Sequence, residues 1–346
     1  MNWATFEIGK IQKVAMTLIS PGSIFSLPQL VVAFIIALAF LTHRQIRRRG
    51  SVRPSAILRA TFRRGIVLNR STYADLFYAF VNTFAVSGLI GWALISGLGV
   101  SSWVTHSLRS AFGGHAPSAA PDWLLRAGNT FLLFIAYEFA YYVDHYLMHK
   151  IPFLWEFHKV HHTAEVLTPL TVFRVHPVDT LIFANIAAII VGFTNGAFAY
   201  SIGKSVGMFQ VDGSNIITVV SLFLLSQLQH SQFWIPITGL GGRIVLSPAH
   251  HQIHHSTDPA HYDTNLGSSL AIWDWMFGTL FIPAKESPRL RFGVVGGGSD
   301  PHRISGLMID PTINAFRALR PAWDRVARTF ARRNALAGDH AVEMDA

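Results

Sequence analysis

Three histidine-rich segments constrain this chain more than any other feature. Residues 141–163 read YYVDHYLMHKIPFLWEFHKVHHT and contain five histidines, and residues 249–256 read AHHQIHHS and contain four more. In a helix, His145 and His149 are one turn apart and lie on the same face, so their imidazoles can share a metal ion. A single pair with this spacing is more often structural. Three such segments in one chain predict a metal centre.

The two histidine triplets have the same spacing. His158, His161 and His162 stand at i, i+3 and i+4, and His251, His254 and His255 repeat that pattern, so each triplet predicts a helical face lined by histidine. Together with the first pair they supply eight imidazoles. That number exceeds the four ligands of a structural zinc site, and it favours two metal ions.

The types of ligand available only partly restrict which metal ion the site can bind. The chain has no cysteine, which excludes disulfides, zinc fingers and iron–sulfur clusters and leaves imidazole and carboxylate as ligands. Imidazole binds iron, zinc, copper and nickel, so the ligand type alone leaves the metal open.

The order HxxxH, HxxHH, HxxHH resembles the fatty acid hydroxylase/sterol desaturase superfamily, whose members are integral-membrane di-iron enzymes. The resemblance extends from Glu138 to about Thr279. It includes the segments Arg174–Pro177, His230–Ser231, Asp263–Gly267 and Trp273–Thr279. Glu138 stands where the family usually has Asp, Tyr146 replaces a common Arg and Leu266 replaces an aromatic residue, but every box histidine is present.

The resemblance implies two iron ions (Fe2+/Fe3+) as cofactors and O2 as co-substrate. It implies hydroxylation or desaturation of a membrane lipid of the sterol, fatty acyl, ether lipid or carotenoid type, and the sequence does not choose among these. No flavin, haem or nicotinamide-binding motif is visible, so the electrons are expected from a separate donor of the cytochrome b5, ferredoxin or reductase type.

The resemblance also supplies the expected ligands. The family commonly has a histidine followed by Ser at the position of His230, and eight box histidines leave coordination positions to fill. The expected metal ligands are His145, His149, His158, His161, His162, His230, His251, His254 and His255. Residues expected to orient them are Glu138, Asp144, His176, His250, Asp263, Asn265 and Asp274. Ordinary turn and capping roles are the alternative for Asp263, Asn265 and Asp274, and a buried structural hydrogen bond is the alternative for Glu138.

Composition places the chain in a membrane. Of its 346 residues 51% are hydrophobic and only 14% charged, which is too apolar for an ordinary soluble domain. The formal net charge of +9 is carried by arginines beside apolar segments without any nucleic-acid motif, so we expect anionic lipid and not nucleic acid as the partner. The predicted fold is an all-α integral membrane protein with four to five transmembrane helices and a cytoplasmic helical cap that holds the di-metal site.

The apolar segments predict the topology. Spans are expected over 24–41, 76–104, from near Leu124 into the first histidine segment, and over 179–204 and 216–228 as a hairpin. The first should stay as an anchor, because no cleavage site follows it. Residues 43–70 contain nine arginines and no acidic residue, which predicts a cytoplasmic loop, whereas 101–122 should be an outer loop. All three histidine segments then share the cytoplasmic face, of the inner membrane in a bacterium or of the endoplasmic reticulum in a eukaryote.

We divide the chain into three parts on this basis. Residues 1–122 form an N-terminal membrane region with the basic loop, 123–285 the histidine-box catalytic domain, and 286–346 a C-terminal tail. Within the tail, 313–333 has the apolar periodicity and the arginines of a basic amphipathic helix. Residues 293–298 (GVVGGG) lack the Lys-Ser/Thr of a phosphate loop and are expected to be a flexible link.

Other functions fit the pattern less well. A membrane metal transporter, or another non-oxidative metal-binding membrane protein, is the main alternative, but transporter sites lie near the bilayer midplane, and these histidines lie at helix ends. A membrane b-type cytochrome needs paired histidines on facing helices, which adjacent His-His doublets suit poorly. A zinc protease is disfavoured because no HExxH sequence occurs.

Overall fold

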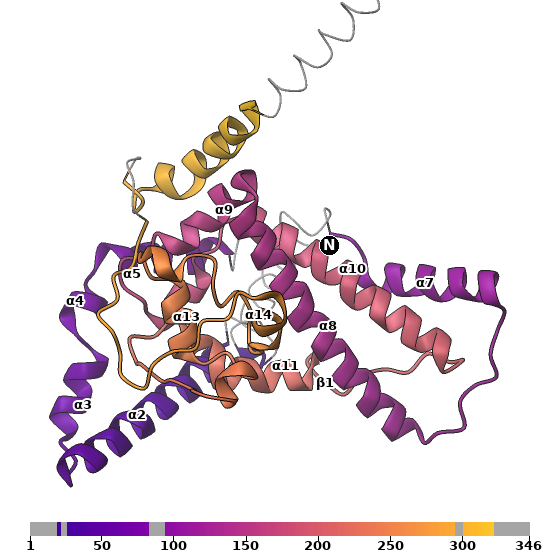
Figure 1. Cartoon of the computed structure of the whole chain (residues 1–346), viewed down its shortest axis with the longest axis horizontal. Helices are drawn as coiled ribbons and strands as arrows, with labels where there is room; N and C mark the ends of the chain where they lie inside the picture. The colour runs from indigo at the N-terminus through magenta and orange to yellow at the C-terminus, as the bar shows by residue number, and fades with distance from the viewer. Residues whose placement is uncertain (1–18, 22–25, 83–93, 295–299, 322–346) are drawn as a thin grey trace, which may run out of the picture.

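The protein is built almost entirely from helices (Figure 1). A computed structural model describes residues 19–21, 26–82, 94–294 and 300–321. Among these residues the only strands are β1 (Gln210–Val211) and β2 (Ser214–Asn215), which pair antiparallel. Asp212 and Gly213 form the hairpin turn at positive φ (48° and 79°), as a two-residue turn between strands requires. The helical part of the predicted fold class is confirmed.

Three helices form the arm that extends to the right in Figure 1. They are α7 (Gly97–Phe112), α8 (Asp122–Lys150) and α10 (Pro177–Ser201). α10 lies against both of the others, and Asn195 of α10 links them, because it donates to Ser101 of α7 (2.9 Å) and accepts from Asn129 of α8 (3.2 Å).

Two glycines of α10 set its close approach to α7. A Cβ on Gly192 would lie 2.6 Å from the carbonyl oxygen of Gly97, and one on Gly196 would lie 2.5 Å from that of Ser101. Small residues four apart let helix backbones approach in this way, and the pattern is common between transmembrane helices.

The N-terminal part of the described chain lies on the other side of the molecule. It consists of α2 (Leu27–Arg49), α3 (Pro54–Thr61), α4 (Arg64–Val67) and α5 (Arg70–Val81). α2 packs against the irregular helix formed by α11 (Ile216–Ser221), the π-helical turn η4 (Leu222–Ser226) and α12 (Gln227–Gln229). Ala33 and Ala37 of α2 are buried there against Leu228 and Phe233.

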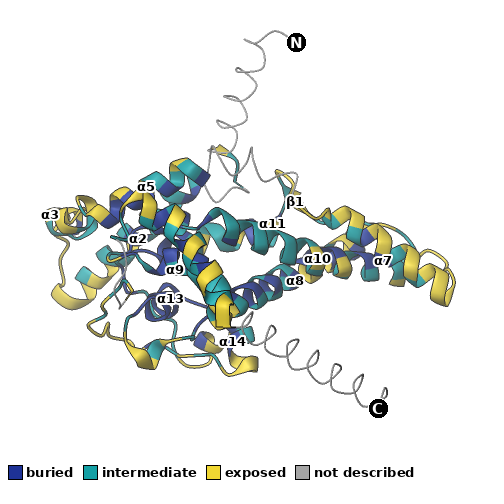
Figure 2. Cartoon of the chain, turned by 90° about the horizontal axis from the view of Figure 1, so that it is seen from above, coloured by how far each residue is buried: buried dark blue, intermediate teal, exposed yellow. Residues whose placement is uncertain are grey.

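Short helices form a cap at the end of α8. They are α9 (Pro152–His162), η3 (Pro169–Phe173), η5 (Gly241–Arg243), α13 (Pro248–His254), η6 (Pro259–His261) and α14 (Ile272–Phe277). α8 ends at Lys150 because Ile151 precedes a proline and is extended (φ −101°, ψ 113°). The π-helical turn η7 (Ser305–Ile309) and helical residues 310–321 then lie across α9, where Phe316 contacts Phe153. Figure 2 shows the buried residues concentrated in this cap and in the inner half of α8.

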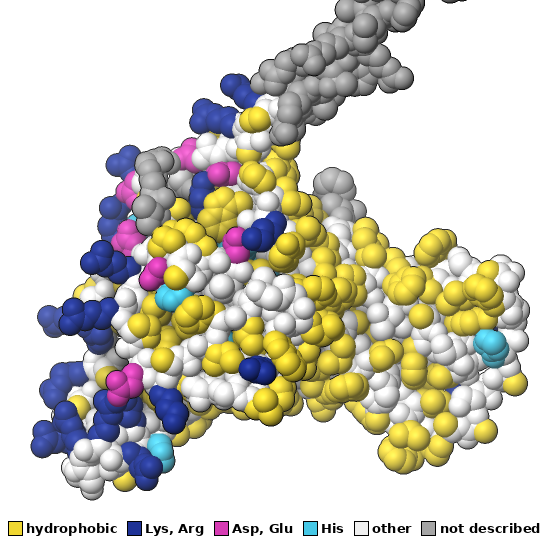
Figure 3. All heavy atoms as spheres, viewed as in Figure 1, with side chains coloured by type: hydrophobic (Ala, Val, Ile, Leu, Met, Phe, Trp, Pro, Cys, Tyr) yellow, Lys and Arg dark blue, Asp and Glu magenta, His cyan; other side chains and the backbone are white. Residues whose placement is uncertain are grey.

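Two helices among the described residues are long and apolar enough to cross a membrane, α2 and α10. Large apolar side chains are also exposed along the arm, among them Leu98, Trp103, Phe131 and Phe193. In Figure 3 hydrophobic side chains cover the arm, and Lys and Arg gather on the opposite side of the molecule. The expected count of four to five spans stays a prediction.

The expected span over 76–104 is wrong in its bounds. α5 ends at Val81, residues 83–93 lie outside the described residues, and a separate helix, α7, begins at Gly97, where the Ser96 side chain accepts a hydrogen bond from the Gly99 backbone N–H. Residues 101–112, expected as an outer loop, are helical, and the first turns of α7, up to Val104, pack closely on the glycines of α10.

The tail is described only in part. Residues 313–321 are helical, as the periodicity predicted, and the remainder of the 313–333 segment lies outside the described residues. So do residues 295–298 of the glycine-rich link.

Candidate metal centre

α8, α9, α12 and α13 bring together all nine histidines expected as ligands. They form two groups, and within each group one nitrogen from every ring lies within 4.8 Å of the others. The first group is His145, His149, His158, His162 and His254, and the second is His161, His230, His251 and His255. The helical cap therefore contains two adjacent histidine clusters, and each could hold a metal ion.

The rings of the first cluster share one orientation. His145 donates through Nδ1 to the Leu266 carbonyl (2.7 Å), and His254 to that of Thr264 (2.8 Å). Nδ1 of His149 and of His158 contacts a carboxylate (3.2 and 2.8 Å). In all five rings Nε2 is buried without a hydrogen-bond partner among the described residues. Five buried ring nitrogens lie close together without a donor, and the Nδ1 contacts make four of them acceptors, which fits a bound cation.

The second cluster points to a cation for a different reason. Nε2 of His230 lies 3.0 Å from Nε2 of His161 and 2.8 Å from Nε2 of His251, which in turn lies 3.1 Å from Nε2 of His255. Nδ1 of His161 faces the Arg174 carbonyl (3.1 Å) and must be its donor, so its Nε2 can only accept.

Hydrogen bonds cannot satisfy this chain of contacts. If the single Nε2 proton of His230 is donated to His161, the same nitrogen cannot accept from His251. Two nitrogens bound at right angles to one ion at about 2.1 Å are about 3 Å apart, which is the spacing seen here. The donor set thus fits a metal ion.

Burial favours the neutral form of imidazole in both clusters. It lowers the pKa of His162, His251, His254 and His255 well below the ordinary value for histidine, and neighbouring imidazoles lower it further. Burial likewise lowers the pKa of His230 to about 4. Only neutral imidazole binds metal, so the apoprotein would hold these ligands ready at neutral pH.

The triplets do not each serve a single cluster. His158 and His162 belong to the first cluster and His161 to the second, whereas His254 belongs to the first and His251 and His255 to the second. Neighbouring residues in a helix are about 100° apart around the axis, so an HH doublet points its two rings to different sites. The prediction of one histidine-lined face per triplet therefore needs this correction.

Asp263 is one proposed orienting residue that contacts a ligand candidate. Its carboxylate accepts from Nδ1 of His149 (3.2 Å) and from Lys150 Nζ (2.6 Å). The hydrogen bond from His149 lowers the pKa of Asp263 to about 2, with burial opposing and Lys150 assisting.

Three other proposed residues do not contact the ligand candidates themselves. They form hydrogen bonds to the backbone of segments that hold those candidates in place. Asp274 accepts from the backbone N–H groups of Leu266 (2.7 Å) and Gly267 (2.8 Å), and so fixes the loop whose Leu266 carbonyl accepts from His145. Glu138 accepts from the next N–H groups of this loop, those of Ser269 and Leu270 (2.8 and 2.9 Å).

The third, Asn265, donates to the His250 and Phe281 carbonyls (3.0 and 2.9 Å) and thereby links α13 to the segment around Phe281.

The remaining proposed residues do not contact the clusters in this way. His176 caps α10 through a bond from the Val178 N–H (3.2 Å). His250 faces away, toward Ser247 Oγ (2.7 Å) and the Gly242 carbonyl (3.1 Å). Asp144 is buried, and its Oδ1 has no hydrogen-bond partner among the described residues.

Sequence reasoning missed Asp179, whose Oδ2 lies 2.8 Å from Nδ1 of His158. It occupies the first turn of α10, two residues after Pro177. A lone acid at the start of an apolar helix that follows an HP pair was the available signal. The backbone acceptors Leu266, Thr264 and Arg174 left no signal, because any residue supplies a carbonyl.

A buried ion pair supports the segment that orients His161 of the second cluster. Both Arg174 and Asp75 are fully buried, and Arg174 Nε donates to Asp75 Oδ1 (2.7 Å). Arg174 also donates hydrogen bonds to Ser71 and Thr163. Its own backbone carbonyl accepts a hydrogen bond from Nδ1 of His161. This pair joins α5 to the segment that orients His161.

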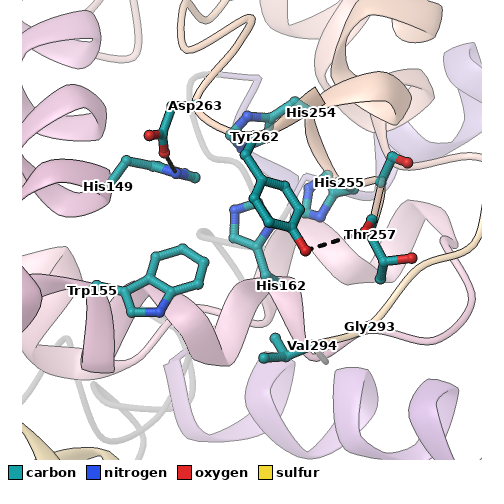
Figure 4. Close-up of a pocket in the computed structure, with 11 residues that line it drawn as sticks. His149, Trp155, His162, His254, His255, Thr257, Tyr262, Asp263, Gly293 and Val294 are labelled. Atoms are coloured by element: carbon teal, nitrogen blue, oxygen red, sulfur yellow. Dashed lines mark hydrogen bonds and ion pairs between the residues drawn. The ribbon is translucent and has the colours of Figure 1, made fainter. Parts of the chain in front are cut away.

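A cavity of about 340 Å³ opens onto the clusters (Figure 4). His149, His162, His254 and His255 line its inner end. Trp155, Thr257, Tyr262, Asp263, Gly293 and Val294 line the rest, and Tyr262 donates to the Thr257 carbonyl (3.1 Å). A substrate in this cavity would meet the histidine clusters directly.

Comparison with known proteins shows which family this part of the chain resembles. A sequence model of the fatty acid hydroxylase family matches residues 130–279, a range that contains all nine histidines. Residues 130–279 are therefore similar to the fatty acid hydroxylase family. The superfamily resemblance inferred from the three histidine segments is thereby confirmed.

Several curated proteins are similar to this domain. Alkylglycerol monooxygenase of Xenopus tropicalis is 30% identical over 160 residues, which cover 45% of this chain and 31% of that protein. Ornithine lipid hydroxylase OlsE of Rhizobium tropici is 30% identical over 167 residues, 48% of this chain and 46% of the relative. Human alkylglycerol monooxygenase is 26% identical over 151 residues, 42% and 29% respectively. The chain thus spans about a third to a half of the length of these relatives, and no solved structure matches it.

Proposed function

We propose that this protein is a membrane-bound oxidoreductase that uses O2 and two iron ions to hydroxylate or desaturate a lipid. The observation that carries the proposal is the pair of adjacent clusters of five and four buried histidines inside a fatty acid hydroxylase domain. The named relatives act on an ether lipid (alkylglycerol) and an ornithine lipid, which supports a lipid as the substrate class.

Each cluster would hold one ion through its Nε2 atoms. His145, His149, His158, His162 and His254 would hold the first, and His161, His230, His251 and His255 the second. When bound, an iron pair supplies the activation of O2 that attack on an unactivated C–H bond needs, since no side chain supplies it.

The chain's own residues prepare that chemistry. Hydrogen bonds from Nδ1 to backbone carbonyls and carboxylates fix the tautomer and the ring orientation of most of the ligands. The cap buries the clusters and keeps water away from the metal-facing nitrogens. Trp155 and Tyr262 give the cavity aromatic walls at which an apolar chain can pack.

The proposed setting is a bilayer crossed by α2 and α10, with the cap on the cytoplasmic side. Lys and Arg gather on the side of the molecule opposite the apolar arm (Figure 3), and α2–α5 and the cap helices α9 and α13 lie toward that side (Figure 1), which supports this orientation. A cytoplasmic cap would also be accessible to a separate electron donor of the cytochrome b5, ferredoxin or reductase type.

Lipidomics tests the proposed reaction. Cells that express the wild-type chain are compared under aeration with cells that express His251→Ala, and with His106→Ala on α7 as a matched histidine control. The proposal expects a lipid class that is heavier by one oxygen or lighter by two hydrogens in the wild type and the control, and not in His251→Ala. Identical lipid profiles in all three would contradict it.

A further inference from the structure

A second cavity lies away from the metal centre, between α2, the α3–α4 segment and the turn that follows His230. Its volume is about 300 Å³, within the range of small-molecule sites. Its lining is mostly apolar and includes Ala33, Phe34, Phe62, Val67, Leu170 and Phe233. The exposed side chains of Phe34, Phe62 and Val67 show that the cavity reaches the surface.

Two arginines adjoin lining residues of this cavity in the sequence, although they do not line it themselves. Arg63 and Arg64 stand between the lining residues Phe62 and Ile66, and both are exposed. Neither guanidinium has an ion-pair or hydrogen-bond partner among the described residues. No acidic residue occurs from 26 to 74, so this part of the chain supplies no counter-ion of its own. An apolar cavity beside two unpaired arginines matches a ligand with an acyl chain and an anionic group.

The cavity adjoins a proposed membrane span. Ala33, Phe34 and Ala37 belong to α2, and Phe34 and Phe62 pack together at a centroid distance of 6.1 Å where α2 meets α3. Val67 and Leu68 continue the exposed apolar surface. A lipid at the membrane surface can therefore place a chain beside α2 while its headgroup stays at the level of the arginines.

The inner wall connects the cavity to a ligand candidate. Gln232, two residues after His230, lines the cavity and donates to the carbonyls of Ala60 (3.3 Å) and Thr61 (3.0 Å) at the end of α3. Ser231, the immediate neighbour of His230, also lines it. A ligand in this cavity would therefore contact the turn that holds His230.

We propose that this cavity binds a bilayer phospholipid with an anionic headgroup, with one acyl chain between α2 and α4 and the headgroup on Arg63 and Arg64. The site is separate from the histidine-lined cavity, with which it shares no lining residue. The inference rests on the proposed membrane setting of α2 and is independent of the proposed reaction.

Native mass spectrometry of the full-length protein tests this site. Delipidated protein is mixed with equal amounts of phosphatidylglycerol and phosphatidylcholine, without reductant or O2, so a failure of the proposed reaction cannot affect the result. The wild type should retain one phosphatidylglycerol in preference to phosphatidylcholine. Arg63→Ala/Arg64→Ala should weaken that retention about tenfold or more. The matched control Arg47→Ala/Arg48→Ala removes the same charge from the last turn of α2, about ten residues beyond Ala37, the last residue of α2 that lines the cavity. It should change retention less than about twofold.

A variant that fills the cavity separates this site from general attraction to basic residues. Val67→Trp should abolish retention with both arginines in place, and Leu68→Trp, at an exposed neighbour that does not line the cavity, should not. Unchanged thermal melting shows that each variant is folded. Equal losses in the two arginine double variants, or full retention in Val67→Trp, would overturn the proposal.

Discussion

The buried pair of Asp75 and Arg174 predicts a large effect from a change that touches no histidine. Asp75→Asn keeps the shape of the side chain but removes the charge that faces a guanidinium with no solvent exposure. Removing one partner of a buried pair costs about 3–5 kcal/mol, because the other charge stays buried. Thr168 and Thr171 also donate to Asp75 (3.2 and 2.8 Å) and would lose a charged acceptor.

The loss should appear both in stability and at the metal centre. Total stabilities are about 5–15 kcal/mol, so the melting midpoint of the purified protein should fall by about 10 °C. The backbone carbonyl of Arg174 accepts a hydrogen bond from His161, which belongs to the second cluster. A shift of Arg174 would disturb that ligand, so the second cluster should lose metal before the first. Tryptophan fluorescence during heating and elemental analysis of the same samples measure the two effects.

Two controls make this prediction specific. Glu156→Gln breaks the partly exposed pair with Lys159 on α9 and should cost about 1 kcal/mol or less. Asp75→Leu combined with Arg174→Met removes both charges and should be more stable than Asp75→Leu alone. An Asp75→Asn protein with unchanged melting and metal content would refute the reasoning.

Three further predictions concern the site and its setting. His230→Ala should lose the metal of the second cluster together with activity, whereas His106→Ala should keep both; normal metal content and turnover in His230→Ala would leave His230 a structural residue. Turnover should require a reductant besides lipid and O2, and product formed without one would contradict the external donor. A reporter fused after Lys285 should be active in the cytoplasm, and activity only on the other side would reverse the proposed orientation.

Much of the candidate site follows from side-chain spacing. Helical periodicity is regular enough that HxxxH and HxxHH alone predict which rings can meet, and the structure brings all eight box histidines and His230 together. The division of His161 and His162 between two clusters depends on where α9 lies relative to α8 and α13. Packing sets that arrangement, and spacing within one helix cannot give it.

The supporting contacts were harder to predict, for a chemical reason. Several of the Nδ1 atoms are held by backbone carbonyls, and a carbonyl belongs to every residue type. Asp274 and Glu138 act through the same loop at 266–270, which only tertiary structure brings to α8. The predicted loop at 101–122 was wrong for a similar reason. Part of it is helix α7, which packs on Gly192 and Gly196 of α10, and composition does not reveal that packing. The three-part division of the chain stays a prediction.

The metal content of the purified protein tests the central claim most directly. Elemental analysis of active protein should give close to two metal ions per chain, because the two clusters offer five and four ligands to separate ions. The similarity to the fatty acid hydroxylase family predicts that the metal is iron. Fully active protein with one tightly held zinc ion per chain would contradict the account.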